Sequence, residues 1–542
     1  MRKKLSLRVL GLVLATSLLF SACGNDAEVS KESSVAPTEK ESVASESSET
    51  APSEQEEKKE LVTLNWYLTT NSIHRGVEQV TKSVHDYVLE KLNVDLQLHW
   101  LTKAEYREKV GTMLTAGDDV DICFTATTYA NLAEYAQMGA FYPLNEFMDD
   151  ELAGTVAALP EGVWPSVTFD ENVYAIPSMK DLVSRFGLKA NQTMLDDLGV
   201  SMPSKIQTAA DLIPMLREAK AAQVAKYPDK ADTPLMDDGV RKLGMWYFFD
   251  GMQGEMVVAN IPGLKGFAGY GEGETVFCPY YTQEYRDYMN LVQDLVEEKI
   301  FAYDHEEFDA DKVLFNEGGL IGQFAEGSVY LDPDTYAPYY TVKWYPCEQG
   351  MMSSAYVRAA CTAITATCKY PERAAEVIEL FNTDGYLETL IRFGEEGIGW
   401  TDKDNNGVIE FEGTQNEDSA NRYWYNWYGM HFGSMYQSKM PPGYPEPAEF
   451  LDMLDELNES GVVSENIGFV FDTTNVVNEV AACSAVEAEY HTGRLLKAQE
   501  ENVDEIIDEF IAKLKANGMD KIVEECQKQL TEWRAANGLS TK

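Results

Sequence analysis

The sequence predicts an α/β protein of two or more lobes, with a mainly parallel sheet and a mainly helical C-terminal region. From Leu61 onward, segments of alternating polarity take turns with segments of helical period, which is typical of βαβ units. About 480 residues follow Leu61, more than one hydrophobic core normally holds. Apolar stripes of helical spacing run through residues 503–514 and 522–533, so we expect the C-terminal end to pack.

The N-terminus has the features of a signal peptide. Arg2, Lys3 and Lys4 precede the uncharged apolar stretch 9–20, and small residues follow it before Cys23. A helix needs about 20 apolar residues to cross a bilayer, so this stretch is too short for a permanent membrane span. We therefore expect residues 1–22 to be removed after export.

Residues 19–24, Leu-Phe-Ser-Ala-Cys-Gly, resemble a bacterial lipobox, with Phe20 where leucine is usual. The resemblance implies that Cys23 becomes the lipidated, palmitate-bearing N-terminus of a lipoprotein on the extracellular face of the cell membrane. The alternative is an ordinary signal peptide in which Cys23 has no role.

Residues 23–60 contain almost nothing that could be buried, because serine, glutamate, alanine, threonine, lysine and proline dominate them. Such a composition predicts a disordered segment. As a flexible coil of roughly 37 residues it has a mean reach on the order of 35 Å. We interpret it as an acidic tether between the lipidated cysteine and the folded part.

The composition limits the partners. A formal net charge of −46 excludes a nucleic-acid partner, because such binding depends on Lys and Arg neutralising phosphates. Of the eight cysteines, Cys23 is assigned to the lipid and the others show no regular framework. Cys361 and Cys368 are the candidates for a bridge, and the sequence leaves open whether any disulfide forms.

The first folded segment predicts strands at 61–67, 94–100 and 121–125, with helices at 77–92 and from 102 toward 117. Thr102 and Glu105 have the spacing of a capping box. In open parallel sheets, ligands bind beyond the carboxyl ends of the strands. We therefore expect Trp66, Tyr67 and the segment 125–129 to face one crevice.

Residues 117–122 (Gly-Asp-Asp-Val-Asp-Ile) and 135–144 (Tyr-Ala-Gln-Met-Gly-Ala-Phe-Tyr-Pro-Leu) resemble the first lobe of family 1 solute-binding proteins of ABC importers. Segments 173–177, 315–327 and 370–376 resemble the family's crossovers between lobes, in the family's order. The resemblance implies a type II periplasmic-binding-protein-like fold with a hinge and a central ligand cleft. It places the first lobe at 61–175 with 311–365, and the second at 176–310 with 366–414.

The C-terminal part resembles a narrower subgroup of large lipoproteins that carry an extra domain of uncharacterised function. The matching segments are 468–474, 480–490, 510–516 and 527–533, the last reading Gln-Lys-Gln-Leu-Thr-Glu-Trp. The resemblance implies an extra domain over 415–542, which we expect to pack on the second lobe.

The sequence lacks the motifs of common enzymes. It has no His-Glu-x-x-His, Gly-x-Ser-x-Gly or phosphate-loop motif, and acidic pairs such as Glu395-Glu396 are expected by chance among 90 carboxylates. We predict a protein that is not an enzyme, with no cofactor and no metal.

One loop leaves a calcium alternative open. Asp402, Asp404, Asn406 and Gly407 match the first half of an EF-hand loop, but Gly413 stands where the bidentate glutamate should be. A β-hairpin turning at the Asn-Gly tip is the favoured interpretation, and calcium binding over 402–413 remains the alternative.

Aromatic residues interleaved with polar ones suit a sugar, whose rings have apolar faces and polar rims. Core packing is the competing explanation for each aromatic taken alone. The predicted ligand-binding residues of the first lobe's side are Trp66, Tyr67, Thr125, Thr127, Tyr129, Phe324 and Glu326. Those of the crossovers and the second lobe are Lys180, Arg185, Trp246, Arg358, Trp400, Trp424 and Trp427.

These observations predict a monomeric solute-binding lipoprotein that closes around an oligosaccharide and delivers it to ABC permease subunits. Closure requires the ligand to bind the closed form more tightly than the open one. The alternatives are a surface glycan-acting hydrolase and a peptide-binding or sensor lipoprotein.

Overall fold

The computed structural model describes residues 59–70, 73–183, 186–236, 254–256, 260–262, 273–302, 322–326, 342–346, 350–412, 423–424, 432–442, 446–498 and 502–541. The predicted signal peptide, Cys23 and most of the predicted tether lie outside these residues. Every element below belongs to the compact unit that begins at Lys58.

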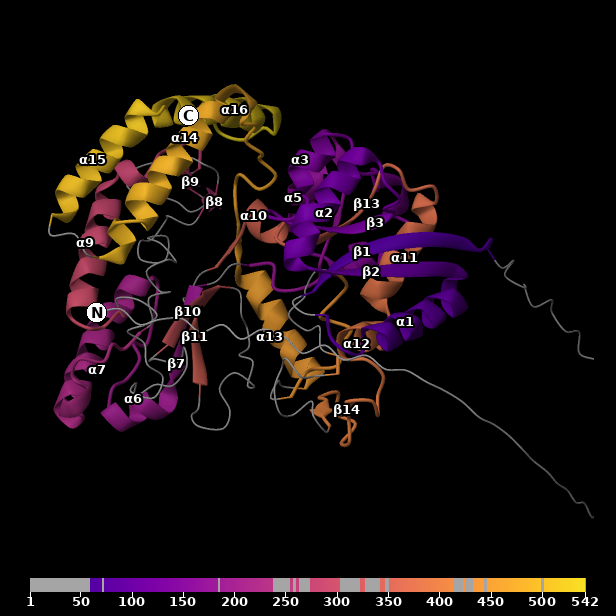
Figure 1. The fold of residues 1–542 in the computed structure, drawn as a ribbon, viewed down its shortest axis with the longest axis horizontal. Helices are drawn as coiled ribbons and strands as arrows, with labels where there is room; N and C mark the ends of the chain where they lie inside the picture. Colours follow the sequence, from indigo (N-terminus) through magenta and orange to yellow (C-terminus); the bar gives the residue numbers. More distant parts are fainter. Residues whose placement is uncertain are drawn as a thin grey trace, which may run out of the picture. The chain divides into compact units, whose positions relative to one another are not determined.

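A five-stranded sheet in the order β2-β1-β3-β13-β6 carries the first core (Figure 1). β1 is parallel to β2 and to β3, whereas β13 is antiparallel to β3 and β6. The parallel βαβ units predicted from the sequence are therefore confirmed. The strands are β1 (Val62–Thr70), β2 (Val94–Thr102), β3 (Ile122–Thr125), β6 (Ile176–Pro177) and β13 (Cys361–Ile364).

The helices between these strands form where the sequence predicts them. The N-cap Thr102 and Glu105 make a complete capping box at the start of α2, and Gly117 ends that helix with a φ of 72°. The helices and short elements of this part are α1 (Val77–Leu92), α2 (Lys103–Ala116), α3 (Leu132–Gln137), η1 (Asn145–Phe147), α4 (Ala153–Ala158), η2 (Glu161–Val163), α5 (Trp164–Val167), β4 (Thr168–Phe169) and β5 (Asn172–Val173).

Two helices that the sequence analysis assigned to the second lobe pack into the first core instead. α11 (Pro371–Thr383) and α12 (Gly385–Phe393) bury Ile378, Phe381 and Leu387 in the same cluster as Leu64 of β1. Their apolar stripes need a sheet face to cover, and β13 delivers the chain directly to this sheet. The expected second-lobe segment 366–414 is corrected accordingly. Before β13 lie β12 (Met351–Met352) and α10 (Ser354–Val357).

The hairpin predicted after α12 is present. β14 (Trp400–Thr401) pairs antiparallel with β15 (Glu410–Phe411), and α13 (Pro447–Ser460) packs with it in a small separate cluster. β16 (Val462–Val463) then pairs with β12 in parallel. This part of the chain is held to the first core rather than to the C-terminal helices, because Leu457 of α13 is buried in the first core.

A second core forms around an antiparallel sheet in the order β10-β7-β11. Because β10 and β11 pair with β7, they lie outside the first lobe in which the range 311–365 had placed them. The elements are β7 (Phe186–Asn191), α6 (Gln192–Leu198), η3 (Ala209–Leu212), α7 (Ile213–Lys226), η4 (Pro228–Lys230), η7 (Pro279–Tyr281), α9 (Gln283–Glu297), β10 (Gly322–Glu326) and β11 (Val342–Pro346). β8 (Gly254–Met256) and β9 (Asn260–Pro262) form a separate antiparallel pair.

The C-terminal helices complete this second core. Phe510 and Leu514 of α15 and Ile522 of α16 are fully buried beside Tyr285 of α9, so the predicted packing of the chain's end is confirmed (Figure 1). The elements are η11 (Thr474–Val476), α14 (Val477–Glu487), the π-helical η12 (Ala488–Thr492), η13 (Leu495–Lys497), α15 (Val503–Ala516) and α16 (Met519–Ala536).

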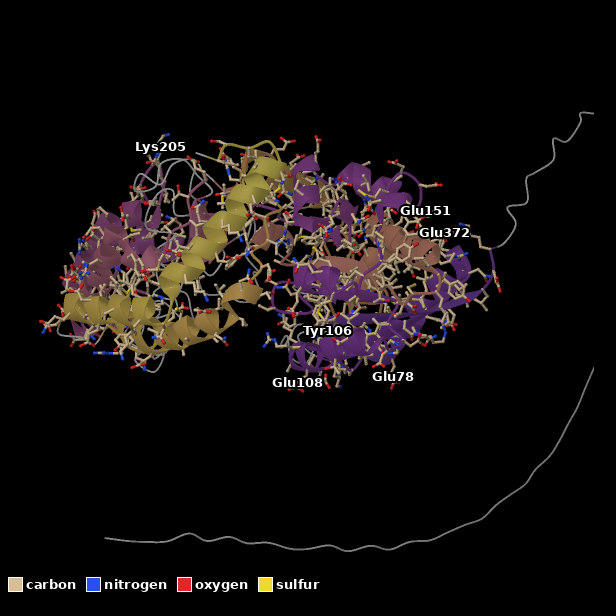
Figure 2. The ribbon with its side chains drawn as sticks, turned by 90° about the horizontal axis from the view of Figure 1, so that it is seen from above. Glu78, Tyr106, Glu108, Glu151, Lys205 and Glu372 are labelled. Carbon is tan, nitrogen blue, oxygen red and sulfur yellow. The ribbon has the colours of Figure 1, made fainter. Side chains whose placement is uncertain are left out.

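The surface carries the excess negative charge. Glu78, Glu108 and Glu372 are exposed, whereas Tyr106 of α2 is fully buried (Figure 2). Among the described residues, no helix combines the length and the apolar character that crossing a membrane requires. The six cysteines that the structure describes, Cys361 and Cys368 among them, are free and buried.

Candidate functional site

Polar side chains gather where several strands of the first sheet end. In the parallel register of β1 and β3, Tyr67 pairs with Cys123. Thr69 and Thr125, each two residues further along its strand, therefore lie level with each other. On the other side of Thr125, Cys361 of β13 pairs with both Thr125 and Pro177. Ser178 follows Pro177 directly, so hydroxyls from three separate strands lie along one edge of the sheet.

These three hydroxyls are buried, and none has a partner among the described residues. Thr69 and Thr125 are fully buried and Ser178 is 3% exposed. Within the described part of the chain, none of the three oxygens has a hydrogen-bond partner. A buried polar group without a partner costs about 1–3 kcal/mol, so a row of them at one edge indicates a place for polar atoms from outside the chain. We call Thr69, Thr125 and Ser178 the strand-end hydroxyls.

The turn after β3 brings an aromatic ring to the same edge. Ala126 bridges Tyr129 in an antiparallel pair of backbone hydrogen bonds, which leaves Thr127 exposed at the tip and Tyr129 half-buried. The guanidinium of Arg107 lies 4.9 Å from the centre of the Tyr129 ring, a cation–π contact that fixes the ring. Thr125, Thr127 and Tyr129 are therefore brought together, in agreement with their predicted placement.

Tyr67 lies on the opposite face of β1 from Trp66. Its ring stacks on His99 of β2 at 4.3 Å, and His99 Nε2 lies 2.9 Å from Asn65 Oδ1. Burial, together with the negative charge of Asp119, raises the pKa of Tyr67. Tyr67 is half-buried, so part of its ring is available at the surface.

Comparison with known proteins agrees with this architecture. A carbohydrate ABC transporter substrate-binding protein of Streptococcus pneumoniae serotype 4 is 22% identical over 468 residues, covering 84% of this chain and 88% of the relative. The crystal structure of the N-glycan transport solute-binding protein NgtS of S. pneumoniae has a TM-score of 0.68 at 19% identity, covering 87% of this chain and 98% of NgtS. NgtS in complex with Man5GlcNAc has a TM-score of 0.60 at 19% identity, with 88% and 100% coverage.

The chain has the fold of a type II solute-binding protein. Residues 466–535 match a domain of unknown function, DUF3502, which confirms the extra C-terminal domain expected from segments 468–533. In a solute-binding fold the carboxyl edge of the first sheet is where a ligand is expected, and the strand-end hydroxyls lie there.

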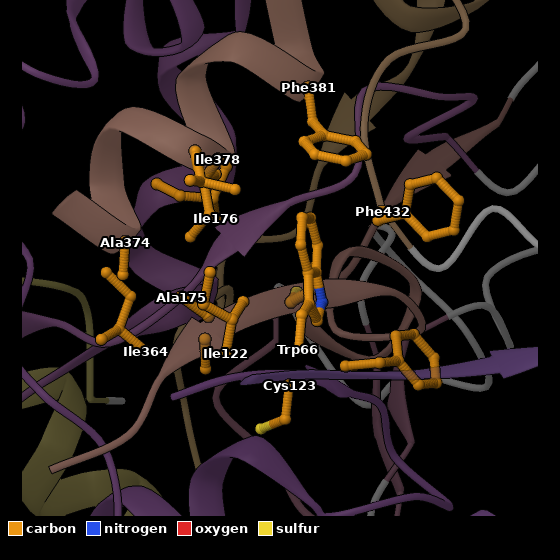
Figure 3. Packing of buried hydrophobic residues seen from close by; sticks show 14 of the residues in the cluster. Trp66, Ile122, Cys123, Ala175, Ile176, Ile364, Ala374, Ile378, Phe381 and Phe432 are labelled. Carbon is orange, nitrogen blue, oxygen red and sulfur yellow. The ribbon is translucent and has the colours of Figure 1, made fainter. Parts of the chain in front are cut away.

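Trp66 is a core residue of this solute-binding fold. Its side chain is 1% exposed and packs edge-on against Phe381 at 4.7 Å and Phe432 at 6.1 Å (Figure 3). Successive strand residues point to opposite faces, so Trp66 and Tyr67 cannot both face one crevice. The sequence analysis joined them, and the structure separates them.

Trp400 and Trp424 are also packed inside. They are 3% and 0% exposed, and their indole N–H groups donate to Gly394 O at 3.0 Å and Ile391 O at 2.8 Å. Both carbonyls belong to the C-terminal end of α12, where backbone acceptors lack helical partners. In this structure the two tryptophans therefore cap a helix rather than line the strand-end edge.

Lys180 and Arg358 are buried and have protein partners. Lys180 Nζ donates to Asp181 O at 2.7 Å and lies 4.4 Å from the centre of the Tyr356 ring. Arg358 donates to the carbonyl of Ser166 and lies over Phe169. Burial raises the pKa of the Asp181 carboxyl, although Lys180 and the Tyr356 hydroxyl lower it. These residues hold the crossover segment in place.

The structure does not describe the side chains of five predicted ligand-binding residues. Arg185, Trp246 and Trp427 lie outside the described residues. Phe324 and Glu326 lie on β10, where they pair in register with Leu188 and Phe186 of β7. This pairing puts them on the second lobe's sheet rather than on the first lobe's side, where they were expected.

The 402–413 loop turns around an ion pair. Asp402 accepts hydrogen bonds from Asn406 N at 3.1 Å and Gly407 N at 3.0 Å, and its carboxylate pairs with Lys439. The ammonium of Lys439 therefore lies beside Asp402, where an EF-hand loop would hold calcium against its first carboxylate. Within the described ranges, no group of three or more histidine, cysteine or acidic residues could hold a metal ion.

The sequence analysis missed Thr69 and Ser178. Each lies close to the carboxyl end of its strand, so the rule that ligands bind at these ends could have predicted both residues. What the sequence could not indicate is that their hydroxyls would be buried without partners.

Proposed function

We propose that this protein is the extracytoplasmic substrate-binding subunit of an ABC importer and that it binds an oligosaccharide at the strand-end hydroxyls. Cys23 carries the lipid that anchors it, and the tether over 23–60 joins the lipid to the folded part. The bound sugar passes to permease subunits without chemical change.

The observation that carries the proposal is the row of unpartnered buried hydroxyls beside Tyr129. A saccharide supplies both complements: hydroxyls for Thr69, Thr125 and Ser178, and an apolar ring face for the tyrosine. The proteins with similar folds support the substrate class, since one of them holds Man5GlcNAc. The name of the S. pneumoniae relative supports the ABC importer.

Calorimetry with purified protein tests the proposal, with Man5GlcNAc and a panel of other oligosaccharides as ligands. Thr125→Val keeps the side chain's shape and Ser178→Ala removes only an oxygen, so each should weaken binding about fivefold, the effect of about 1 kcal/mol per hydrogen bond. Neither change should lower the melting temperature, because neither oxygen has a protein partner.

Ser166→Ala is the matched control. Ser166 is also fully buried and its hydroxyl also lacks a partner, but it lies in α5 rather than at the strand ends. Its removal should leave affinity unchanged. Tight binding of a peptide with no binding of any glycan would refute the substrate class, and equal losses in all three variants would refute the site.

A further inference from the structure

A cavity lies away from the strand-end hydroxyls. It has a volume of about 410 Å³ and is enclosed by α12, the loop after it, the β14 hairpin and residues 436–439. None of the strand-end hydroxyls lines it, and neither does Tyr129. Its size falls within the range of about 300–1,000 Å³ that is usual for small-molecule sites.

Three aromatic side chains line this cavity: Tyr386, Trp400 and Tyr436. The polar groups of two of them are already used by the protein. The Trp400 N–H donates to Gly394 O, and the Tyr436 hydroxyl donates to Asp455 at 2.9 Å and accepts from Asn458 at 3.2 Å. What Trp400 and Tyr436 can offer a ligand is therefore ring surface. Tyr386 is 58% exposed, so its ring is available as well.

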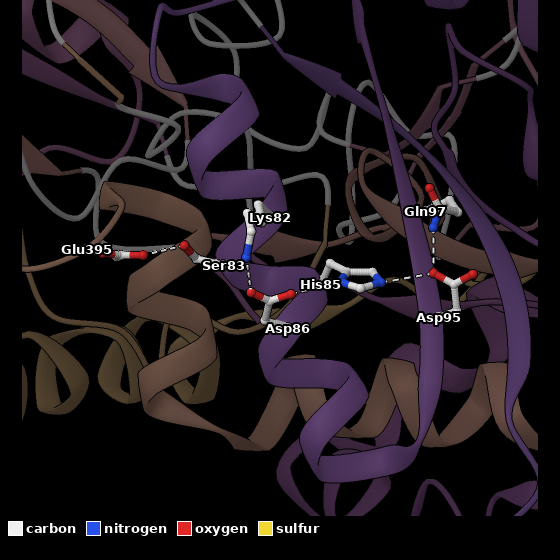
Figure 4. Close-up of polar contacts among 7 residues, drawn as sticks. All are labelled: Lys82, Ser83, His85, Asp86, Asp95, Gln97 and Glu395. Atoms are coloured by element: carbon white, nitrogen blue, oxygen red, sulfur yellow. Dashed lines mark hydrogen bonds and ion pairs between the residues drawn. The ribbon is translucent and has the colours of Figure 1, made fainter. Parts of the chain in front are cut away.

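The polar side chains of the cavity have unused bonding capacity. Ser438 is only 3% exposed, and within the described residues its hydroxyl has no hydrogen-bond partner. Glu395 accepts a hydrogen bond from Ser83 of α1 through one oxygen (Figure 4), and Glu396 accepts one at 3.4 Å from Asp402 N. In each of these two contacts one oxygen of the carboxylate is engaged, and a carboxylate accepts several hydrogen bonds.

The charge of the cavity restricts its ligand. Lys439 is the one cation among the described residues that line the cavity, and the Asp402 carboxylate neutralises it. Glu395 and Glu396 therefore leave the cavity negative, which disfavours phosphates and acidic sugars. Hydroxyl donors suit the two carboxylates and the Ser438 oxygen.

We propose that this cavity is a second binding site and that it takes one neutral sugar ring. The apolar face of the ring lies against the aromatic side chains, and its hydroxyls donate to Glu395 and Glu396 and bond to Ser438. This second site does not depend on the proposed import function, because the two sites share no residue and either can exist without the other.

Saturation-transfer NMR on the full mature chain tests this site, with mannose, glucose and N-acetylglucosamine as separate probes. The Thr125→Val and Ser178→Ala changes are combined throughout, so that binding at the strand-end hydroxyls is weakened in every measurement. We expect at least one sugar to bind with a dissociation constant on the order of a millimolar, because a single sugar ring has few atoms that can contact the protein. Ser438→Ala and Tyr386→Ala should each weaken this binding about fivefold or more.

Two controls separate binding from folding. Tyr370→Ala removes a similarly exposed tyrosine, 43% accessible, that does not line the cavity, and it should leave binding unchanged. Ser438→Ala should keep or raise the melting temperature, because it removes a buried hydroxyl without a partner. Since Tyr386 is exposed, its replacement tests the site even if Ser438→Ala fails to fold.

Three results would overturn the inference. One is the absence of binding by all three sugars. The second is binding that neither Ser438→Ala nor Tyr386→Ala weakens. The third is that tetramethylammonium binds at this cavity while the sugars do not, because the aromatic rings and carboxylates would then serve an organic cation.

Discussion

At the scale of single residues, the face of the strand decides whether an aromatic side chain is buried. Tyr129 was placed from the end of β3, and it lies beside Thr125. The same rule placed Trp66 at the expected ligand crevice. Trp66 lies instead on the face of β1 that packs into the first core, against Phe381. Predicting a binding residue from its position at a strand end therefore also requires knowing which face of the sheet its side chain is on.

His491 gives a prediction for pH. It is held in the second core, where the Tyr285 hydroxyl lies 2.7 Å from its Nδ1, and burial lowers its pKa to about 4. The unfolded chain takes up this proton below pH of about 6.5, whereas the folded chain does so only near 4. The folded state should therefore lose stability as pH falls from about 6.5 to about 4, by up to about 3 kcal/mol.

Urea unfolding at pH 7.5, 5.5 and 4.5 measures this effect. The variant His491→Gln cannot take up the proton, so its stability should fall less between pH 7.5 and 4.5 than that of the natural protein. An identical pH dependence in both proteins would show that other groups account for the acid sensitivity.

At the scale of elements, the C-terminal helices share one core with the second lobe. Residues of α14, α15 and α16 share one buried cluster with residues of α7 and α9. Arg286 of α9 adds ion pairs to Asp504 at 2.9 Å and Asp508 at 2.7 Å on α15. The apolar stripes at 503–514 and 522–533 predicted packing, but they could not indicate the partner.

Phe510→Ala should lower the free energy of unfolding by about 3–5 kcal/mol, because the ring is fully buried and its removal leaves a cavity between α15 and α9. Thermal and urea denaturation would measure it. The comparison is Arg286→Ala, which breaks ion pairs to aspartates that are largely exposed and should cost less than about 1 kcal/mol. Similar costs for the two variants would contradict burial as the main source of this contact's stability.

At the scale of the whole molecule, localisation and binding are encoded in separate parts of the chain. The features that predict export and anchoring lie before Leu61, while both proposed binding sites lie in the compact unit that begins at Lys58. A change in one part should therefore leave the other part's activity intact.

Cys23→Ser tests the anchor. If Cys23 carries the lipid, metabolically supplied radioactive palmitate should label the natural protein and not the variant, and the variant should move from the membrane fraction to the medium or remain uncleaved. Purified variant should bind glycans as the natural protein does. Palmitate labelling that survives the substitution would disprove the assignment of Cys23.

The sequence alone determined the order and type of the first elements. The period of apolar residues sets strand or helix locally, and the Thr102–Glu105 box and Gly117 mark the ends of α2 within a few residues. Composition likewise predicted the acidic tether and argued against a nucleic-acid partner. These properties depend on neighbours in the chain, so they can be read without the fold.

Only the tertiary structure decided which segments share a core and which polar groups lack a partner. α11 and α12 join the first core, and β10 joins β7, through pairings between residues far apart in the chain. The buried hydroxyls of Thr69, Thr125 and Ser438 follow from such pairings too, because a hydroxyl lacks a partner only once every neighbour is placed. Local patterns therefore predicted the elements, whereas the long-range packing determined the sites.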